Sequence, residues 1–200
     1  ETEADVVEAS ALYILAPIYE ILHELYAGKW VRSAERTHVT PNEEAEEKEC
    51  VRYDLTFQTP SYNGIQGETI AILEYKKRNM IRYDDFKATL LSAHASEITI
   101  QSLKDEIEDQ DKETYLQRNA QAYSKQVCKY AATSRCQHVA LFNWDNLLLY
   151  RFDRAKIGKG DTGDQANLTW VNESGIGGKF VQKCYIRKAI LGWILKAFED

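Results

Sequence analysis

The chain has 200 residues, of which 44% are hydrophobic, 28% charged and 11% aromatic. This length and composition predict one globular domain with its own hydrophobic core and exclude an intrinsically disordered protein. No run of about eighteen apolar residues occurs, because charged side chains interrupt the longest apolar segments, so we expect a soluble protein without a transmembrane helix.

The 31 acidic residues outnumber the 25 basic residues, which gives a net charge of -6. This sign excludes a protein that holds nucleic acid chiefly by neutralising many phosphates, so any nucleic-acid binding must be local. The cysteines lack the spacing of a zinc site or a redox pair, and we expect reduced thiols in an intracellular protein, nuclear or cytoplasmic. They are Cys50, Cys128, Cys136 and Cys184.

The first predicted element is a long amphipathic helix, which Pro17 kinks or splits and Gly28 ends. Its apolar residues recur at spacings of three and four and share one face. They are Val7, Ala11, Ile14, Leu15, Ile18, Leu22 and Leu25. An acidic stretch at residues 41–49 follows and predicts a solvated loop.

Two strands are predicted next, at residues 50–58 and 68–77. The residues between them, 60–67, include Pro, Asn and two Gly, which favour a turn and hence a β-hairpin. The second strand is apolar at consecutive positions before it becomes charged, which is typical of a strand buried on both faces.

The remaining pattern alternates helices and strands. Helical spacing begins at Asp84, and the polar segment 101–112 is an insertion or an exposed helix. A strong helix is predicted at 115–132, followed by two strands at 138–144 and 147–152. A C-terminal helix is predicted at 180–198. This order predicts an α/β layered domain with a central mixed sheet flanked by helices. We expect one domain over residues 1–200, with a core at about 10–152 and a C-terminal helical extension at about 179–200.

Three charged residues of the hairpin stand out: Asp54 on the first strand, and Glu74 and Lys76 on the second. Side chains two residues apart on a strand point to the same face, so Glu74 and Lys76 face one volume, which Asp54 can join from the paired strand. Two converging carboxylates suit Mg²⁺ or Mn²⁺, and the backbone carbonyl of Tyr75 is a third candidate ligand. Lys76 beside the ion could orient the attacking water.

This pattern of Asp followed by Glu-x-Lys resembles the PD-(D/E)xK nuclease superfamily. In the RecB-type and Mrr-like branch of that family, a helix after the hairpin carries Gln-x-x-x-Tyr, and Gln126-Val-Cys-Lys-Tyr130 stands at that place. The family also often places a Glu on the helix before the first strand, for which Glu24 and then Glu20 are the candidates. Two further segments, 122–126 and 141–145, are similar to a group of fungal proteins.

The resemblance implies a restriction-endonuclease-like fold and a metal-dependent nuclease that hydrolyses phosphodiester bonds, with DNA favoured over RNA as the substrate. Asp54 and Glu74 would bind the metal, together with Tyr75 and Glu24. Lys76 would assist the hydrolytic water, and Gln126 and Tyr130 would position Lys76 or the substrate. The alternative is a catalytically inactive binding or regulatory module with the same fold, which the negative net charge favours, with a fused or partner domain outside this chain.

Simpler interpretations of the same residues stay open. Glu74 and Lys76 can be an ordinary ion pair at a strand end, and Gln126 and Tyr130 can be ordinary residues at a helix border. Lys77 and the neighbouring Arg78 follow the charged strand end, where they bind substrate phosphates or form a solvated basic turn.

Overall fold

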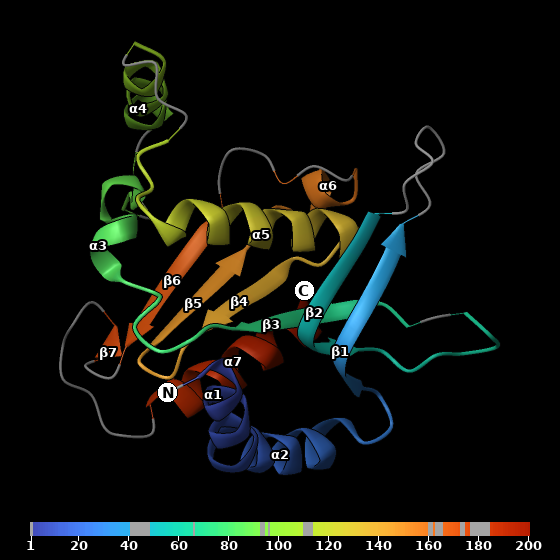
Figure 1. Ribbon diagram of the computed structural model, residues 1–200. Helices are drawn as coiled ribbons and strands as arrows, with labels where there is room; N and C mark the ends of the chain where they lie inside the picture. The colour runs from blue at the N-terminus through green and yellow to red at the C-terminus, as the bar shows by residue number, and fades with distance from the viewer. Residues whose placement is uncertain are drawn as a thin grey trace.

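In the computed structural model, a mixed β-sheet runs through the centre of the molecule, with helices on both of its faces (Figure 1). The structure describes residues 2–40, 49–65, 67–92, 95, 97–109, 114–159, 162, 166–172, 175–176 and 185–200. Within this part of the chain, the strands lie side by side in the order of the sequence. The predicted α/β class, with a central mixed sheet flanked by helices, is confirmed.

All neighbouring strands are antiparallel except β3 and β4, which are parallel. The strands are β1 (Val31–Thr40), β2 (Glu49–Gln58), β3 (Thr69–Tyr75), β4 (His138–Phe142), β5 (Asn146–Arg151), β6 (Asn167–Asn172) and β7 (Gly175–Ile176). The antiparallel pairing of β2 with β3 confirms the predicted hairpin. Parallel strands need a crossover rather than a tight turn, and the chain between β3 and β4 contains helix α5.

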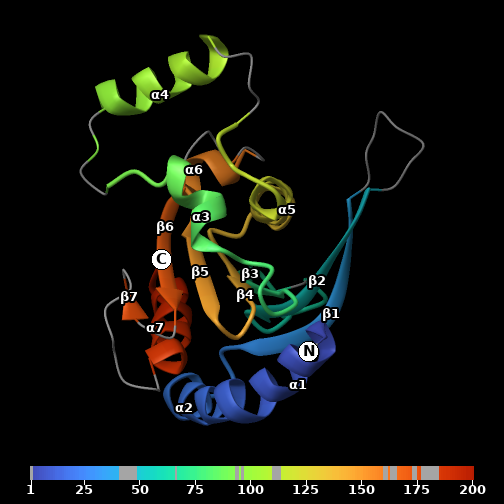
Figure 2. The same cartoon turned by 60° about the vertical axis from the view of Figure 1, so that its left-hand side comes forward.

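The helices form two layers around the sheet. Helix α5 covers one face, while α1, α2 and α7 lie against the other (Figures 1 and 2). The helices are α1 (Glu3–Ser10), α2 (Ala16–Tyr26), α3 (Tyr83–Phe86), α4 (Glu97–Asp109), α5 (Asn119–Ser134), α6 (Arg154–Ile157) and α7 (Tyr185–Glu199).

Strand β3 separates two hydrophobic cores because its side chains alternate between the faces. Leu73 and Tyr75 belong to the core under α1, α2 and α7, whereas Ile72 belongs to the core under α5. Glu74 has the same parity as Ile72, so its side chain points toward α5. The alternation of the strand therefore places a carboxylate on the α5 side of the sheet.

The N-terminal helix is interrupted by a π-helical turn at Ala11–Leu15, and Pro17 lies in the first turn of α2. A π-helical turn shifts the residues that follow it around the helix axis, so the predicted apolar stripe is only partly buried. Val7 and Leu25, which we expected inside, are 40% and 58% exposed. The segment Glu3–Tyr26 is long and apolar enough to cross a membrane. Signal sequences and the core helices of soluble proteins share this length and composition.

Strands β1 and β6 have no counterpart among the predicted elements. β1 carries charged residues close together, such as Arg32, and pairs on one side only, so its sequence lacks the pattern of a buried strand. β6 extends the sheet past residue 152, and Trp193 of α7 packs in the core. The sheet and the hydrophobic core thus continue beyond residue 152 and include part of the C-terminal helix; residues 179–184 lie outside the described part.

The structure also corrects the predicted start of α5 and decides between the two interpretations of the polar segment at 101–112. Helix α5 begins at Asn119 rather than 115, because Arg118 has φ +47°, outside the helical region. The polar segment at 101–112 lies partly in α4, which projects from the domain (Figure 2) and whose Ile98 is 82% exposed. This segment is thus an exposed helix as far as the described residues reach.

Candidate active site at the end of strand β3

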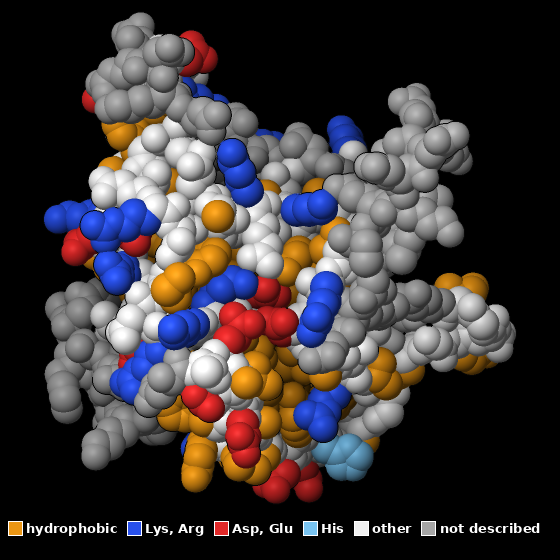
Figure 3. Space-filling model, viewed as in Figure 1, with side chains coloured by type: hydrophobic (Ala, Val, Ile, Leu, Met, Phe, Trp, Pro, Cys, Tyr) orange, Lys and Arg blue, Asp and Glu red, His pale blue; other side chains and the backbone are white. Residues whose placement is uncertain are grey.

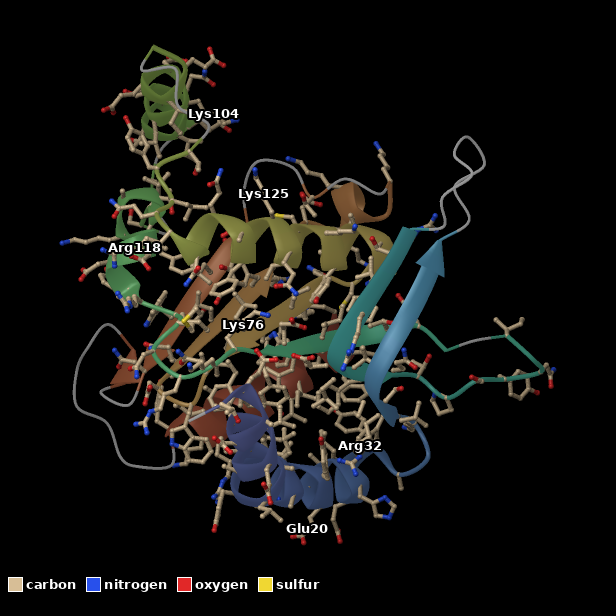
Figure 4. The ribbon with its side chains drawn as sticks, in the orientation of Figure 1. Glu20, Arg32, Lys76, Lys104, Arg118 and Lys125 are labelled. Atoms are coloured by element: carbon tan, nitrogen blue, oxygen red, sulfur yellow. The ribbon has the colours of Figure 1, made fainter. Side chains whose placement is uncertain are left out.

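The charged end of β3 forms a close ion pair on the α5 side of the sheet. Lys76 Nζ lies 2.6 Å from Glu74 Oε1, and the two side chains are only 11% and 6% exposed. Figure 4 shows Lys76 at the end of this strand, beneath α5. The predicted placement of both side chains on one face follows from their spacing, and their burial distinguishes the pair from an ordinary surface ion pair.

Asp54 reaches the same strand end from β2. The regular pairing of β2 with β3 extends to Leu55 opposite Leu73. Beyond it, Asp54 Oδ2 accepts a hydrogen bond from the backbone N–H of Tyr75, at 2.8 Å. Burial raises the pKa of Glu74, and the negative charge of Asp54 contributes in the same direction.

Helix α5 provides the third side of the site. Gln126 Nε2 donates a hydrogen bond to Glu74 Oε1, at 2.7 Å, and another to the hydroxyl of Tyr130. The two residues are four apart and therefore share one helix face. Burial raises the pKa of the Tyr130 hydroxyl, and the nearby Glu74 carboxylate raises it further, so this phenol stays neutral.

Burial dominates the electrostatics of Glu74 and raises the pKa of its carboxyl group. The ammonium of Lys76 opposes this effect. While Oε1 has two donors, the buried Oε2 atom has no hydrogen-bond partner among the described residues. An unpaired carboxylate oxygen in a buried position is costly unless a cation or a proton satisfies it.

The donor set suits a hard divalent cation. Mg²⁺ takes oxygen ligands and is commonly bound through one or two carboxylates while it keeps several waters. Lys76 N–H donates to the Phe142 carbonyl of β4. The Tyr75 carbonyl and the Lys76 N–H belong to one trans peptide group and point in opposite directions. The Tyr75 carbonyl therefore points away from β4, toward β2 and Asp54. No group of three or more His, Cys, Asp or Glu residues that could hold a metal occurs in the described ranges.

The structure does not bring Glu24 or Glu20 to this site. Both are exposed on α2, which packs on the face of the sheet opposite α5, and Figure 4 shows Glu20 on the outer side of that helix. The physical reason is that the inner face of α2 is occupied by apolar side chains, including Ile18 and Leu22. The Tyr75 side chain also lies on that face, where its hydroxyl forms a hydrogen bond with Ser10 of α1.

Sequence reasoning missed one residue near the site. The Lys76 ammonium lies 5.3 Å from the ring centroid of Tyr123, in a cation–π arrangement, and burial raises the pKa of the Tyr123 phenol. Tyr123 precedes Gln126 by three positions, so the helical spacing could have revealed it.

The basic residues after β3 lie in a bend beside the ion pair. Lys77 is exposed, whereas Arg78 forms a bidentate contact with Asp145, with Nε 2.9 Å from each carboxylate oxygen. Together with Asn79, these residues line an open hollow of about 410 Å³. In the view of Figure 3, acidic side chains gather near the centre of this face and Lys and Arg side chains surround them.

Comparisons with models of known protein families, with curated proteins and with solved structures found no match to this chain. The geometry of the site therefore carries the functional argument.

Proposed function

We propose that the protein is a metal-dependent nuclease of the PD-(D/E)xK type, which hydrolyses phosphodiester bonds of DNA in preference to RNA. The observation that carries this proposal is the unpartnered, buried Oε2 atom of Glu74, next to Asp54 and beside the partly buried Lys76. Carboxylates can hold a divalent metal ion that activates water, and a neighbouring lysine can offset the charge that develops on the phosphate.

Asp54 and Glu74 would hold Mg²⁺ or Mn²⁺, with the Tyr75 carbonyl as a further oxygen ligand. The bound ion would polarise the phosphate and lower the pKa of a water molecule. Lys76 would orient the attacking water and offset the negative charge that develops on the phosphate. In hydrolysis, the water oxygen bonds to phosphorus and loses a proton, the bond from phosphorus to one ester oxygen breaks, and that oxygen takes up a proton.

Gln126 and Tyr130 would act as positioning residues rather than as direct participants. Gln126 bonds the same oxygen of Glu74 that Lys76 contacts, so it limits the rotation of the carboxylate. A fixed ligand orientation favours metal binding, since the ordering of the side chain precedes the binding event.

The same features support a restriction-endonuclease-like fold. The hairpin with Asp54 and Glu74 is followed by the helix that carries Gln126 and Tyr130, as the resemblance implies, and that helix packs beside the charged end of β3. The mixed sheet between two helical layers is consistent with this assignment.

The second candidate function is a catalytically inactive module that binds nucleic acid or regulates a partner. The ion pair of Lys76 with Glu74 favours it, because the carboxylate already has a counter-ion, and the net charge of -6 disfavours tight binding of a polyanion.

Cleavage assays separate the two candidates. Wild-type protein, Lys76→Met and the surface control Lys188→Met are incubated with labelled single- and double-stranded DNA and RNA, with Mg²⁺, with Mn²⁺ or with EDTA. The nuclease proposal predicts metal-dependent cleavage by the wild type and the control, and at least a hundredfold slower cleavage by Lys76→Met. A folded wild-type protein that cleaves none of the substrates would favour the inactive module.

A further inference from the structure

The hollow beside the ion pair begins one residue after Lys76. It is lined by Lys77, Arg78 and Asn79 from the bend after β3 and by Asp145 from the turn between β4 and β5. Its volume of about 410 Å³ is open to solvent on one side. Because Lys77 follows Lys76 directly in the chain, a long ligand bound at Lys76 can also reach this hollow.

An ion pair and a hydrogen bond connect the segment after β3 with the turn between β4 and β5 at the hollow. Arg78 joins Asp145 through Nε at 2.9 Å and through Nη2 at 2.8 Å, and Asn146 Nδ2 donates to the Ile81 carbonyl at 3.1 Å. Within the bend, Met80 N–H donates to the Lys77 carbonyl at 3.2 Å. The lining is consequently preorganised, which lowers the entropic cost of binding.

The charges of the lining favour an anion. The bidentate contact neutralises Asp145 with Arg78, so the exposed Lys77 leaves the hollow with a positive charge in a chain of net charge -6. The amide of Asn79 adds hydrogen-bond donors.

We propose that this hollow binds a backbone phosphate of a polynucleotide, next to the phosphate that lies at Lys76. The inference rests on the proposed function, since it needs a nucleic-acid strand at the end of β3. A polynucleotide carries a phosphate at every nucleotide, so a strand held at Lys76 presents its neighbouring phosphate to Lys77 and Asn79. Asp145 acts as a positioning residue that orients Arg78.

The test compares Lys77→Ala with Lys188→Ala, which removes the same charge from an exposed position on α7 that does not line the hollow. Binding of a fluorescein-labelled 16-nucleotide DNA is measured by anisotropy in Ca²⁺ between about 50 and 200 mM KCl. Loss of one phosphate contact predicts that the slope of log K against log salt falls by about 0.7 to 0.9 in Lys77→Ala, while Lys188→Ala keeps the wild-type slope.

A second measurement uses hydrolysis in Mg²⁺. We expect kcat/KM for the DNA to fall several times more in Lys77→Ala than kcat/KM for bis(p-nitrophenyl) phosphate, which has no neighbouring phosphate. An unchanged thermal midpoint in both variants shows that the fold is intact.

The outcomes distinguish this inference from the nuclease proposal. A changed salt slope in Lys77→Ala with no hydrolysis by the wild type supports the phosphate site and contradicts the nuclease. Cleavage by the wild type, with Lys77→Ala equal to Lys188→Ala in both measurements, overturns the phosphate site. Loss of inorganic phosphate binding in Lys77→Ala without an effect on DNA also overturns it, because it identifies a site for a free anion.

Discussion

The carboxylate of Asp54 accepts a hydrogen bond from the backbone N–H of Tyr75, at 2.8 Å, where the regular pairing of β2 with β3 ends. Asp54 thus satisfies the backbone N–H of Tyr75 and adds a negative charge near Glu74. The contact ties the geometry of the sheet to the electrostatics of the candidate active site.

The first prediction separates the charge of Asp54 from its hydrogen bond. The amide oxygen in Asp54→Asn can still accept from Tyr75, so we expect a small change in unfolding free energy, within about 1 kcal/mol, but at least a tenfold loss of Mn²⁺ affinity. Calorimetric titration with Mn²⁺ and thermal unfolding measure the two effects. Unchanged Mn²⁺ affinity would remove Asp54 from the ligand set.

The second prediction concerns the ion pair. Lys76→Met removes the ammonium from two neighbouring carboxylates, so we expect Mn²⁺ affinity to be retained or increased while DNA cleavage falls at least a hundredfold. Lys125→Met, on the exposed side of α5, is the matched control. A loss of Mn²⁺ affinity in folded Lys76→Met would show that the lysine supports metal binding, contrary to the proposed role.

The third prediction concerns Gln126. In Gln126→Leu the Glu74 carboxylate loses a donor in a part-buried position, and we expect a loss of about 1 to 2 kcal/mol of unfolding free energy and a lower kcat. Tyr130→Phe, which keeps the ring and removes the hydroxyl, should have a smaller effect. Urea unfolding and steady-state kinetics provide the readouts, and equal stability of Gln126→Leu and wild type would argue against the positioning role.

The fourth prediction concerns pH. Burial raises the pKa of Glu74 above the ordinary value of a glutamate, so the folded state holds this proton to a higher pH than the unfolded state. The Glu74 contribution to unfolding free energy therefore falls as pH rises from the unfolded-state pKa through the folded-state pKa. Glu74→Gln should flatten this part of the profile, measured by urea unfolding across pH.

Metal binding is linked to the same proton. Mn²⁺ needs the ionised carboxylate, so its affinity should weaken as pH falls through the raised pKa of Glu74, with proton release on binding. Titrations in buffers with different ionisation enthalpies count the released protons. Binding without proton release throughout that pH range would indicate that Glu74 is not a ligand.

The fifth prediction tests the core under α5. Ile72 is fully buried in β3, and Ile72→Ala should cost about 2 to 5 kcal/mol of unfolding free energy. Ile98→Ala on α4 makes the same chemical change at a position that is 82% exposed and should alter it by less than about 0.5 kcal/mol. Similar losses at both positions would contradict the packing described here.

Local patterns in the sequence predicted the parts of the site that depend on local geometry. The two-residue spacing of Glu74 and Lys76 and the four-residue spacing of Gln126 and Tyr130 each determine a shared face. The contact of Asp54 with the backbone of Tyr75 depends on where β2 leaves the ladder, which side-chain patterns do not encode.

Two predictions about the N-terminal part of the chain failed because local side-chain patterns do not encode the features that decide them. The π-helical turn at Ala11–Leu15 alters the buried face of the N-terminal helix, and periodicity at 3.6 residues per turn cannot anticipate it. The edge strand β1 forms through pairing with β2, although Arg32 and its neighbours lack a buried alternation. In β1, pairing with a strand that follows later in the chain thus overrides the local pattern, whereas in the N-terminal helix the π-helical turn breaks the regular period.

Crystallography of the wild-type protein soaked in Mn²⁺, with anomalous scattering at the manganese edge, tests the central claim most directly. The proposal predicts one anomalous peak within coordination distance of carboxylate oxygens of both Asp54 and Glu74, and its loss in Asp54→Asn. A well-ordered site without a peak at millimolar Mn²⁺, with Lys76 still bound to Glu74, would contradict it.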